Sequence, residues 1–597
     1  MESKIRQNKM YISKIFLTIL LIASTIMALI YCAQKRGYYV DEGMTFVLSN
    51  GQYNGAVTSR PEGDFGDFLD KYVLKNSFSE TLSNVYEMLK ETKGAGNYSE
   101  EGKVDWYDEG RKLLQGSSTW ITGQELRNQI VAESGQRFDY GQVYMNQVVD
   151  VHPPLYYFFV HTIFSLFHGE YSDLLLSGLN IVFLLSTAIL LFRLISSRTK
   201  RKVLAFMALI LFSFSQGYFS CSVYYRMYAM LTFWMMLTFY ILIEAKDRNW
   251  ELKRSQWFTW GLVVFCGFLT HYYFVFYVIL LFIVSIIKLI RRREKVAVKK
   301  YTLTMVLAGV AGLMVWPAAI YHVFFGYRGK ETIANITRMP FIGRFKQLLD
   351  SFCNALFLGN YVLMTGVVLL GLIIVIAFLI RKRAGSGKDM AEDNPVKTWL
   401  KNNVAELIIP VIVYSFFVVS TAPEVSMRYF YCLMPFICIL IAYILFGGCS
   451  VFDFSKLKIN KYQQYLGLLI TIIWSILSLI ITKPEYLYTD NANPLNFDEI
   501  SKENTKLLMI EVNAGAAFPY ILDMADYSEV MVTTTDNLAE IQNKKPSEEK
   551  DMLVYIDPYV EESILDNVVE YMGLEKPCKE VYSGPEGRVY YFKSQLN

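Results

Sequence analysis

The residues best suited to chemistry in this sequence form two acidic groups beside long apolar runs. Asp41 and Glu42 stand together in GYYVDEGMTF, and Asp150 lies two positions before His152 in VVDVHPPLYY. A carboxylate can act as a general base that takes a proton from an attacking hydroxyl group. Ionisable groups next to hydrocarbon are costly and usually functional, so Asp41, Glu42 and Asp150 are candidate catalytic residues.

Cationic and aromatic side chains form a second set of candidates. Arginine can hold a phosphate group through a planar fork, and aromatic rings at headgroup depth can line a lipid path or stack on sugar faces. Each such residue alone also has a structural reading, as a snorkelling cation or as part of an aromatic belt. As a set they indicate a substrate-binding site, made of His152, Tyr225, Arg226, Tyr228, His271, Tyr272, Arg428 and Tyr429.

The elements that must position these residues are membrane helices. Of 597 residues, 53% are hydrophobic and 19% are charged, which is too apolar for soluble domains of this length. No CxxC or zinc-ligand spacing occurs, and no nucleic-acid partner is expected. With about 20 apolar residues needed per crossing, we predict about eleven spans. They lie near residues 11–32, 172–195, 202–220, 226–245, 257–271, 273–290, 302–321, 361–380, 404–421, 429–447 and 463–482.

Lysine and arginine clusters give the orientation, because they mark cytoplasmic loops. With the N-terminus inside, every cluster falls inside only if the run 152–167 is not a span. That run is about 16 residues long, which is short for a crossing and typical of an interfacial segment. We therefore predict a surface helix whose first turn holds Pro153 and Pro154, with a short tilted span as the alternative. The clusters lie at 196–202, 246–254, 288–300, 381–388 and 456–462.

Two segments are then extracytoplasmic, the loop 33–153 and the tail 483–597. Thr122 and Glu125 form a capping box in the loop. The tail alternates β-rich runs (LLMIEV, EVMVTT, DMLVYI) with helical ones and ends in a hairpin, KEVYSGPEGRVYYF. The prediction is an α-helical polytopic membrane protein. Its membrane module spans 1–482 and precedes a small C-terminal extracytoplasmic α/β domain.

In this topology all the candidate residues lie at the extracytoplasmic face. A general base, phosphate-binding cations and an apolar groove together suit group transfer from a lipid-linked phosphosugar. Asp41 would deprotonate the acceptor oxygen, which attacks the anomeric carbon, while Arg226, Arg428 or both hold the leaving lipid phosphate. Asp150 would orient the acceptor or bind a metal. The stereochemistry of the transfer, inverting or retaining, is left open.

The same residues carry a family resemblance. The stretches VDEGMTF, DVHPPLYYFFVH, YYRMYAML, LTHYYFVFY and MRYFYCLMP occur in order between residue 40 and about residue 436. They resemble the GT-C superfamily of membrane glycosyltransferases, in the branch of protein O-mannosyltransferases and the lipid A aminoarabinose transferase. The resemblance implies an extracytoplasmic active site, a polyprenyl-phosphate sugar donor and Asp41 as the base of the DE pair.

This chain departs from simpler members by an insertion near 55–140 in its first outer loop, which leaves the acceptor open as a glycan, lipid or protein of the cell envelope. Some branches need a divalent metal, but no DxD motif occurs, so we favour a cofactor-free enzyme. We expect a multi-pass protein of the plasma membrane that contacts membrane lipids. The alternatives are a transporter or flippase of lipid-linked saccharides, and a polymerase or ligase of them. A receptor anchored by the spans is a weaker one.

Overall fold

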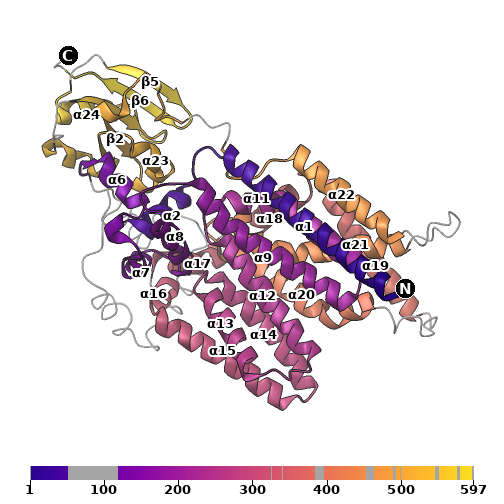
Figure 1. Ribbon diagram of the computed structural model, residues 1–597. Coiled ribbons are helices and arrows are strands. Elements are labelled where there is room, and N and C mark those ends of the chain that lie inside the picture. The colour runs from indigo at the N-terminus through magenta and orange to yellow at the C-terminus, as the bar shows by residue number, and fades with distance from the viewer. Residues whose placement is uncertain are drawn as a thin grey trace. The chain divides into compact units, whose positions relative to one another are not determined.

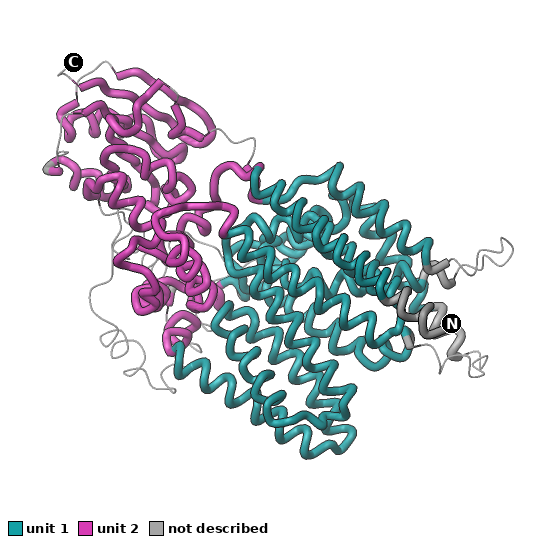
Figure 2. Tube along the Cα trace, viewed as in Figure 1, with its two compact units in different colours: residues 1–33, 176–316, 335–485 teal, residues 34–175, 317–334, 486–597 magenta. Residues whose placement is uncertain are grey.

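The computed structural model describes residues 2–51, 118–324, 326–338, 340–383, 395–451, 463–488, 493–497, 499–544, 550–574 and 578–594. Most of the insertion predicted near 55–140 lies outside these residues. The chain forms two compact units (Figure 2). Unit 1 comprises residues 1–33, 176–316 and 335–485, and unit 2 comprises residues 34–175, 317–334 and 486–597.

Unit 1 is built from long apolar helices (Figure 1). Among the described residues, seven helices are long and apolar enough to cross a membrane, or up to nine if each of two bent pairs counts as one span. The helices are α1 (Glu2–Gln34), α9 (Asp173–Thr199), α10 (Lys202–Ser213), α11 (Gln216–Val223), α12 (Tyr228–Asp247), α13 (Arg254–Phe268), α14 (Tyr273–Arg291), α15 (Lys295–Val315), α18 (Phe341–Leu356), α19 (Tyr361–Arg383), α20 (Pro395–Thr421), α21 (Met434–Val451) and α22 (Gln463–Ile481).

Every predicted span overlaps one of these helices, but the count of eleven is not confirmed. The predicted span 202–220 is the pair α10–α11, bent by 50°. The bend has a local cause, because the Ser215 hydroxyl accepts a hydrogen bond from the backbone N–H of Tyr218 at 3.1 Å and so caps a new helix. Helix α13 has 15 residues, about 22 Å of rise, which is short of a full crossing.

Unit 2 contains a six-stranded sheet in the order β1-β3-β2-β4-β6-β5. The three central strands are parallel, and the predicted C-terminal hairpin is the antiparallel pair β5–β6. All the strands predicted in the tail are therefore present. The strands are β1 (Ile121–Thr122), β2 (Thr505–Glu511), β3 (Glu529–Thr534), β4 (Asp551–Ile556), β5 (Lys579–Gly584) and β6 (Gly587–Phe592).

One face of this sheet forms the core of the tail. Alternate residues of β2 and β4, such as Leu508 and Val554, pack with Val568 of helix α24 (Ile564–Met572). Strand β1 comes from the first loop and pairs with β3. The predicted capping box holds there, because Thr122 accepts from the Glu125 N–H at 3.1 Å and Glu125 accepts from the Thr122 N–H at 2.7 Å. The first loop and the tail thus belong to one unit. The sequence-based division at residue 482 places them in separate domains.

In its described residues the first loop forms helices α2 (Val40–Asn50), α6 (Gly123–Ile130) and α7 (Tyr140–Val149), and helix α8 (Leu155–Leu166) follows it. Helix α8 is the predicted surface helix, and it has 12 residues, about 18 Å of rise. Pro154 is its N-cap, so both prolines precede the first turn and do not lie in it. A helix this short does not cross about 30 Å of hydrocarbon. Its position at the membrane surface stays a prediction.

One buried ion cluster joins three helices of unit 1, and the sequence reading did not single it out. Glu406 of α20 is 1% exposed. Its Oε1 accepts from Lys246 of α12 at 2.7 Å, and its Oε2 accepts from Lys288 of α14. Lys246 and Lys288 belong to basic clusters predicted to be cytoplasmic, so the cluster lies towards that end of the helices.

We predict that Glu406→Ala destabilises unit 1, because it leaves two lysines without their carboxylate. Removing one partner of a buried ion pair costs about 3–5 kcal/mol. Thermal unfolding of the detergent-solubilised protein should show a clearly lower Tm. The exposed Glu251 is the matched control, and Glu251→Ala should leave Tm within experimental error. Equal Tm values for the two variants would contradict the structural role of Glu406.

Candidate active site

Glu42 lies in the first turn of α2 and is committed to structural contacts. Its side chain is fully buried. Its Oε2 accepts hydrogen bonds from the backbone N–H of Tyr39 at 2.8 Å and from the Lys35 ammonium at 3.1 Å. Lys35 also donates to the backbone carbonyl of Tyr486 at 2.8 Å. With these contacts Glu42 caps the helix and neutralises a buried lysine, so it is not placed to serve as a base.

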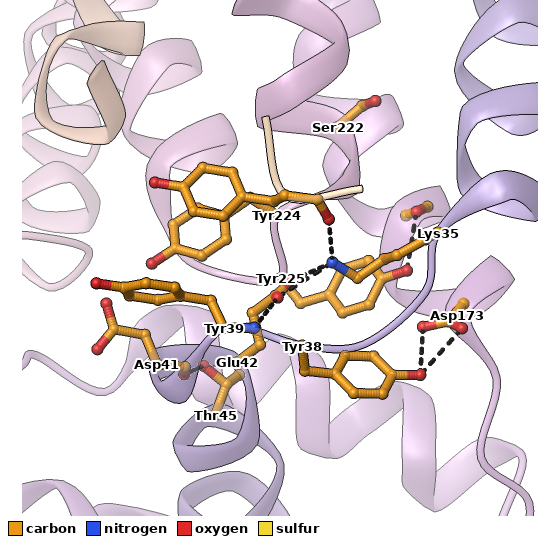
Figure 3. A network of polar contacts seen from close by, with 12 residues as sticks. Lys35, Tyr38, Tyr39, Asp41, Glu42, Thr45, Asp173, Ser222, Tyr224 and Tyr225 are labelled. Atoms are coloured by element: carbon orange, nitrogen blue, oxygen red, sulfur yellow. Dashed lines mark hydrogen bonds and ion pairs between the residues drawn. The ribbon is translucent and has the colours of Figure 1, made fainter. Parts of the chain in front are cut away.

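Asp41 is the partly exposed member of the acidic pair. Figure 3 shows its carboxylate pointing away from Glu42 and Lys35, although the two acids are neighbours in the chain. The Asp41 backbone carbonyl accepts from the Thr45 hydroxyl at 2.9 Å, which is the ordinary pattern inside a helix. An acidic side chain in a first turn is also favoured by the positive end of the helix dipole. The two adjacent acids thus have different environments, because Glu42 is buried and Asp41 is partly exposed.

A tyrosine beside this turn is held by an acid that the sequence reading missed. The Tyr38 hydroxyl donates to both carboxylate oxygens of Asp173, at 3.1 and 3.2 Å (Figure 3). The Tyr171 hydroxyl donates to the same carboxylate at 2.9 Å. Burial, together with the nearby Asp173 carboxylate, raises the pKa of Tyr38 above its ordinary value. Tyr38 therefore keeps its proton and acts as a hydrogen-bond donor.

Asp150 and His152 form a pair, as their spacing allows, and a second histidine lies beside them. Asp150 is the C-cap of α7, and its Oδ2 is 2.8 Å from Nδ1 of His152. His322 of helix α16 (Ala318–Phe324) donates from Nε2 to the Val148 carbonyl at 2.9 Å. Burial lowers the pKa of His322 to about 4, and the Asp150 carboxylate opposes that effect only in part. His322 is thus neutral at pH 7.

In unit 1 the candidate residues gather around Tyr228. Its ring stacks on that of Tyr224, with centroids 5.8 Å apart and an interplanar angle of 10°. The rings of His271 and Tyr429 lie 5.7 and 5.9 Å from it. Arg428 donates to the Tyr224 hydroxyl at 3.2 Å. Four of the predicted binding residues therefore do form one cluster: Tyr228 begins α12, His271 lies in the turn before α14, and Arg428 and Tyr429 lie in the 3-10 helix Met427–Leu433.

The other predicted residues of unit 1 have separate environments. Arg226 is 2% exposed in the turn before α12. The Tyr225 hydroxyl accepts from the Ser177 hydroxyl at 3.5 Å, and the Tyr272 hydroxyl accepts from the Trp316 indole at 2.9 Å. Arg428 also forms an ion pair with Glu424 at 2.6 Å. Glu424 is largely exposed, whereas Arg428 is buried.

The candidates thus fall into two sets, one in each unit. Unit 2 holds Asp41, Glu42, Asp150 and His152, and unit 1 holds the remaining seven. The single site expected from the sequence stays a prediction. No group of three or more His, Cys, Asp or Glu side chains suited to a metal occurs in the described part of the chain. Metal independence also stays a prediction.

A glycine in the DEG motif sets how closely α2 packs on the tail. A Cβ atom on Gly43 would lie 2.2 Å from the carbonyl oxygen of Phe518, in the 3-10 helix η8 (Ala514–Tyr520). Real Cβ contacts are never this short, so only glycine permits the approach. Helix α2, which carries Asp41, therefore rests directly on backbone from the C-terminal tail. The sequence around Gly43 does not predict this contact, because Phe518 is far away along the chain.

Comparisons with known proteins show a partial sequence match to one family and a likeness of fold to a solved structure. Residues 152–328 match the dolichyl-phosphate-mannose-protein mannosyltransferase family. The fold is similar to the crystal structure of ArnT from Cupriavidus metallidurans bound to undecaprenyl phosphate, with a TM-score of 0.50 and 9% identity over 96% of this chain and 98% of that chain. ArnT in the apo state matches at TM-score 0.40 and 10% identity, over 74% and 87%. No curated protein sequence matches.

The predicted resemblance to the GT-C superfamily is thereby confirmed. The predicted fold class is confirmed in its coarse form, as a largely helical protein with several apolar spans and a small C-terminal sheet. These features indicate a multi-pass membrane protein. The orientation of the termini stays a prediction.

We predict that Gly43→Ala lifts α2 from η8, because the added methyl group meets a backbone oxygen that cannot rotate away. Overpacking of this kind costs about 1–3 kcal/mol, and a lower Tm in thermal unfolding should report it. Gly178→Ala is the matched control, since no atom lies within 4 Å of its added Cβ in helix α9. If Gly43→Ala unfolds at the same temperature as Gly178→Ala, the close packing inferred at η8 is wrong.

We predict that His322 makes the protein less stable below neutral pH. Its pKa falls from 6.5 to about 4 on folding, so its stabilising contribution is complete above pH 6.5 and is lost as the pH falls towards 4. The full loss amounts to about 3 kcal/mol. The drop in Tm between pH 7.5 and pH 5 should be smaller for His322→Gln than for the wild type. The exposed His168 serves as the control, and His168→Gln should keep the wild-type drop.

Proposed function

We propose that this chain is a membrane glycosyltransferase that moves a sugar from a polyprenyl-phosphate donor to an extracytoplasmic acceptor. The fold likeness to ArnT extends over nearly all of both chains, and that protein binds undecaprenyl phosphate. The mannosyltransferase family match includes His152, Arg226 and His271. The observation that carries the proposal is the contrast between the two acids of α2. Glu42 is buried in structural contacts, and Asp41 is partly exposed.

In the proposed reaction Asp41 takes the proton from an acceptor hydroxyl group. The acceptor oxygen forms a bond to the anomeric carbon of the sugar, and the bond from that carbon to the phosphate oxygen breaks. The electron pair leaves with the polyprenyl phosphate, which Arg226, Arg428 or both stabilise as an anion. A phosphate leaves without a proton donor, so one carboxylate is enough. We leave open whether the transfer inverts or retains the anomeric configuration.

The remaining candidates have supporting roles in this proposal. Asp150 orients the acceptor, and its bond to His152 fixes the direction of the carboxylate. The cluster of Tyr228, His271 and Tyr429 offers ring faces on which a sugar or an isoprenoid unit can pack. No step requires a metal. The protein is proposed to lie in the plasma membrane, with its N-terminus in the cytoplasm and its tail outside.

A transporter or flippase of lipid-linked saccharides is the main alternative. It needs ionisable groups or broken helices near the middle of its spans. The buried acid Glu406 lies in α20, but it is paired with Lys246 and Lys288 of basic, predicted cytoplasmic segments. The bent pairs α10–α11 and α18–α19 are the features that favour transport. A polymerase or ligase of such saccharides would share the outer loop and the arginines, but not the acidic pair of α2.

We predict that Asp41→Asn lowers the turnover number by about 10²–10⁴-fold, because the amide cannot accept the proton. The assay supplies purified protein with a panel of polyprenyl-phosphate sugars and measures transfer to cell-envelope acceptors. Asp41 is partly exposed, so the Tm and the KM for the donor should change little. Glu42→Gln, by contrast, should lower Tm because it leaves Lys35 buried without its carboxylate.

Full activity of Asp41→Asn with a valid donor would show that another group is the base. Movement of labelled donor across a vesicle membrane, with no sugar transferred to any acceptor, would instead support the flippase reading.

A further inference from the structure

In the tail sheet the carboxyl ends of the three parallel strands β3, β2 and β4 lie side by side. Strand β2 lies between β3 and β4, while the chain visits them in the order β2, β3, β4. The chain leaves β2 towards β3 on one side and leaves β4 towards β5 and β6 on the other, so the carboxyl ends of β2 and β4 form a topological switch point. In open α/β sheets, ligands bind at such points, where the loops diverge.

Three oxygen-bearing side chains share one face of the sheet at this edge. Glu511 ends β2 and is the register partner of Thr534, which ends β3. Asp557 follows β4, whose Ile556 pairs with Ile510, and its N–H donates to the Ile510 carbonyl at 2.9 Å. Side chains in register on adjacent parallel strands point to the same face. Thr534, Glu511 and Asp557 therefore form a row across the three strands.

This row is buried and short of partners. Glu511, Thr534 and Asp557 are 0%, 3% and 5% exposed. With both acids ionised, neither carboxylate oxygen of Glu511, nor the Thr534 hydroxyl, has a hydrogen-bond partner in the described part of the chain. The carboxyl groups of Glu511 and Asp557 are close enough to share a proton. One Asp557 oxygen accepts from the Tyr559 N–H at 2.8 Å. No lysine or arginine of the described residues pairs with either acid. Two buried carboxylates without a counter-charge are costly, so the pair must be neutralised either by a proton or by a bound cation.

We propose that Glu511, Asp557 and Thr534 bind a hard divalent cation, Ca²⁺ or Mg²⁺. Carboxylate and hydroxyl oxygens are the ligands these ions prefer, and a bidentate carboxylate such as Glu511 can supply suits Ca²⁺ in particular. The cation supplies the missing counter-charge and the missing partner of the Thr534 hydroxyl at once. With only two acidic ligands, the site binds weakly, with Kd of about 10⁻⁴–10⁻³ M, as in extracellular calcium modules.

A shared proton is the competing occupant of this site. Burial raises the pKa of Glu511 well above its ordinary value, and the neighbouring Asp557 carboxyl adds to that effect. A proton between the two acids would neutralise one charge. It would leave the Thr534 hydroxyl unpaired, however, and it would make the site indifferent to added cations. These two differences decide between the occupants.

The test is thermal unfolding of the full-length protein after treatment with a chelator, with CaCl₂ or MgCl₂ added back at pH 7.5. We expect Tm to rise with cation concentration for the wild type. Glu511→Gln should lose the rise, and Thr534→Val, which keeps both acids, should weaken binding about tenfold or more. Glu540, an exposed acid of the same unit, is the control, and Glu540→Gln should keep the wild-type response.

Terbium luminescence gives a second readout that does not depend on unfolding. Tyr520 and Tyr555 lie close to Glu511, with ring centroids 5.9 Å apart, so they can sensitise Tb³⁺ bound at the site. Calcium should displace the terbium signal in the wild type, and Glu511→Gln should lack that signal. A wild type whose Tm ignores both cations, or a Glu511→Gln variant that keeps the response, would overturn the proposal in favour of the shared proton.

Discussion

The buried ion pair between Lys35 and Glu42 is the constraint on which the candidate base depends. A buried carboxylate alone would be costly, but Glu42 accepts from the Lys35 ammonium and from the Tyr39 N–H at once. Lys35 is fixed in turn by the Tyr486 carbonyl and lies over the rings of Tyr38 and Tyr488. Because the Lys35 ammonium and both Glu42 carboxylate oxygens have fixed partners, the first turn of α2 has one orientation. The direction of Asp41 follows from it.

The C-terminal tail is therefore a structural part of this region of unit 2. Tyr486 holds Lys35, and Phe518 contacts α2 through Gly43. Strand β1 of the first loop adds an edge to the tail sheet through β3. These contacts give the tail a role that its sequence did not reveal, which is to fix the helix that presents Asp41.

The sequence predicted what depends on local pattern. The capping box at Thr122, the tail strands and the approximate helix positions all follow from neighbouring residues, and all are present. It could not predict which acid of the DE pair is buried, because Glu42 depends on a lysine held by a carbonyl 451 residues further along the chain. His322 was missed for the same reason, since its contact with Val148 is long-range. The span count stays unconfirmed where helices are short or bent.

The adjacency of Asp41 and Glu42 itself argues for single-base chemistry. Successive residues of a helix point about 100° apart, so two neighbouring acids at its start cannot face one reacting centre together. Glycoside hydrolases need two carboxyl groups on either side of the bond, because their leaving group requires a proton. A phosphate leaving group removes that requirement, so the second acid is free for a structural role. Burying Glu42 to orient Asp41 is compatible with transfer from a lipid phosphate and is poorly suited to hydrolysis by a carboxylate pair.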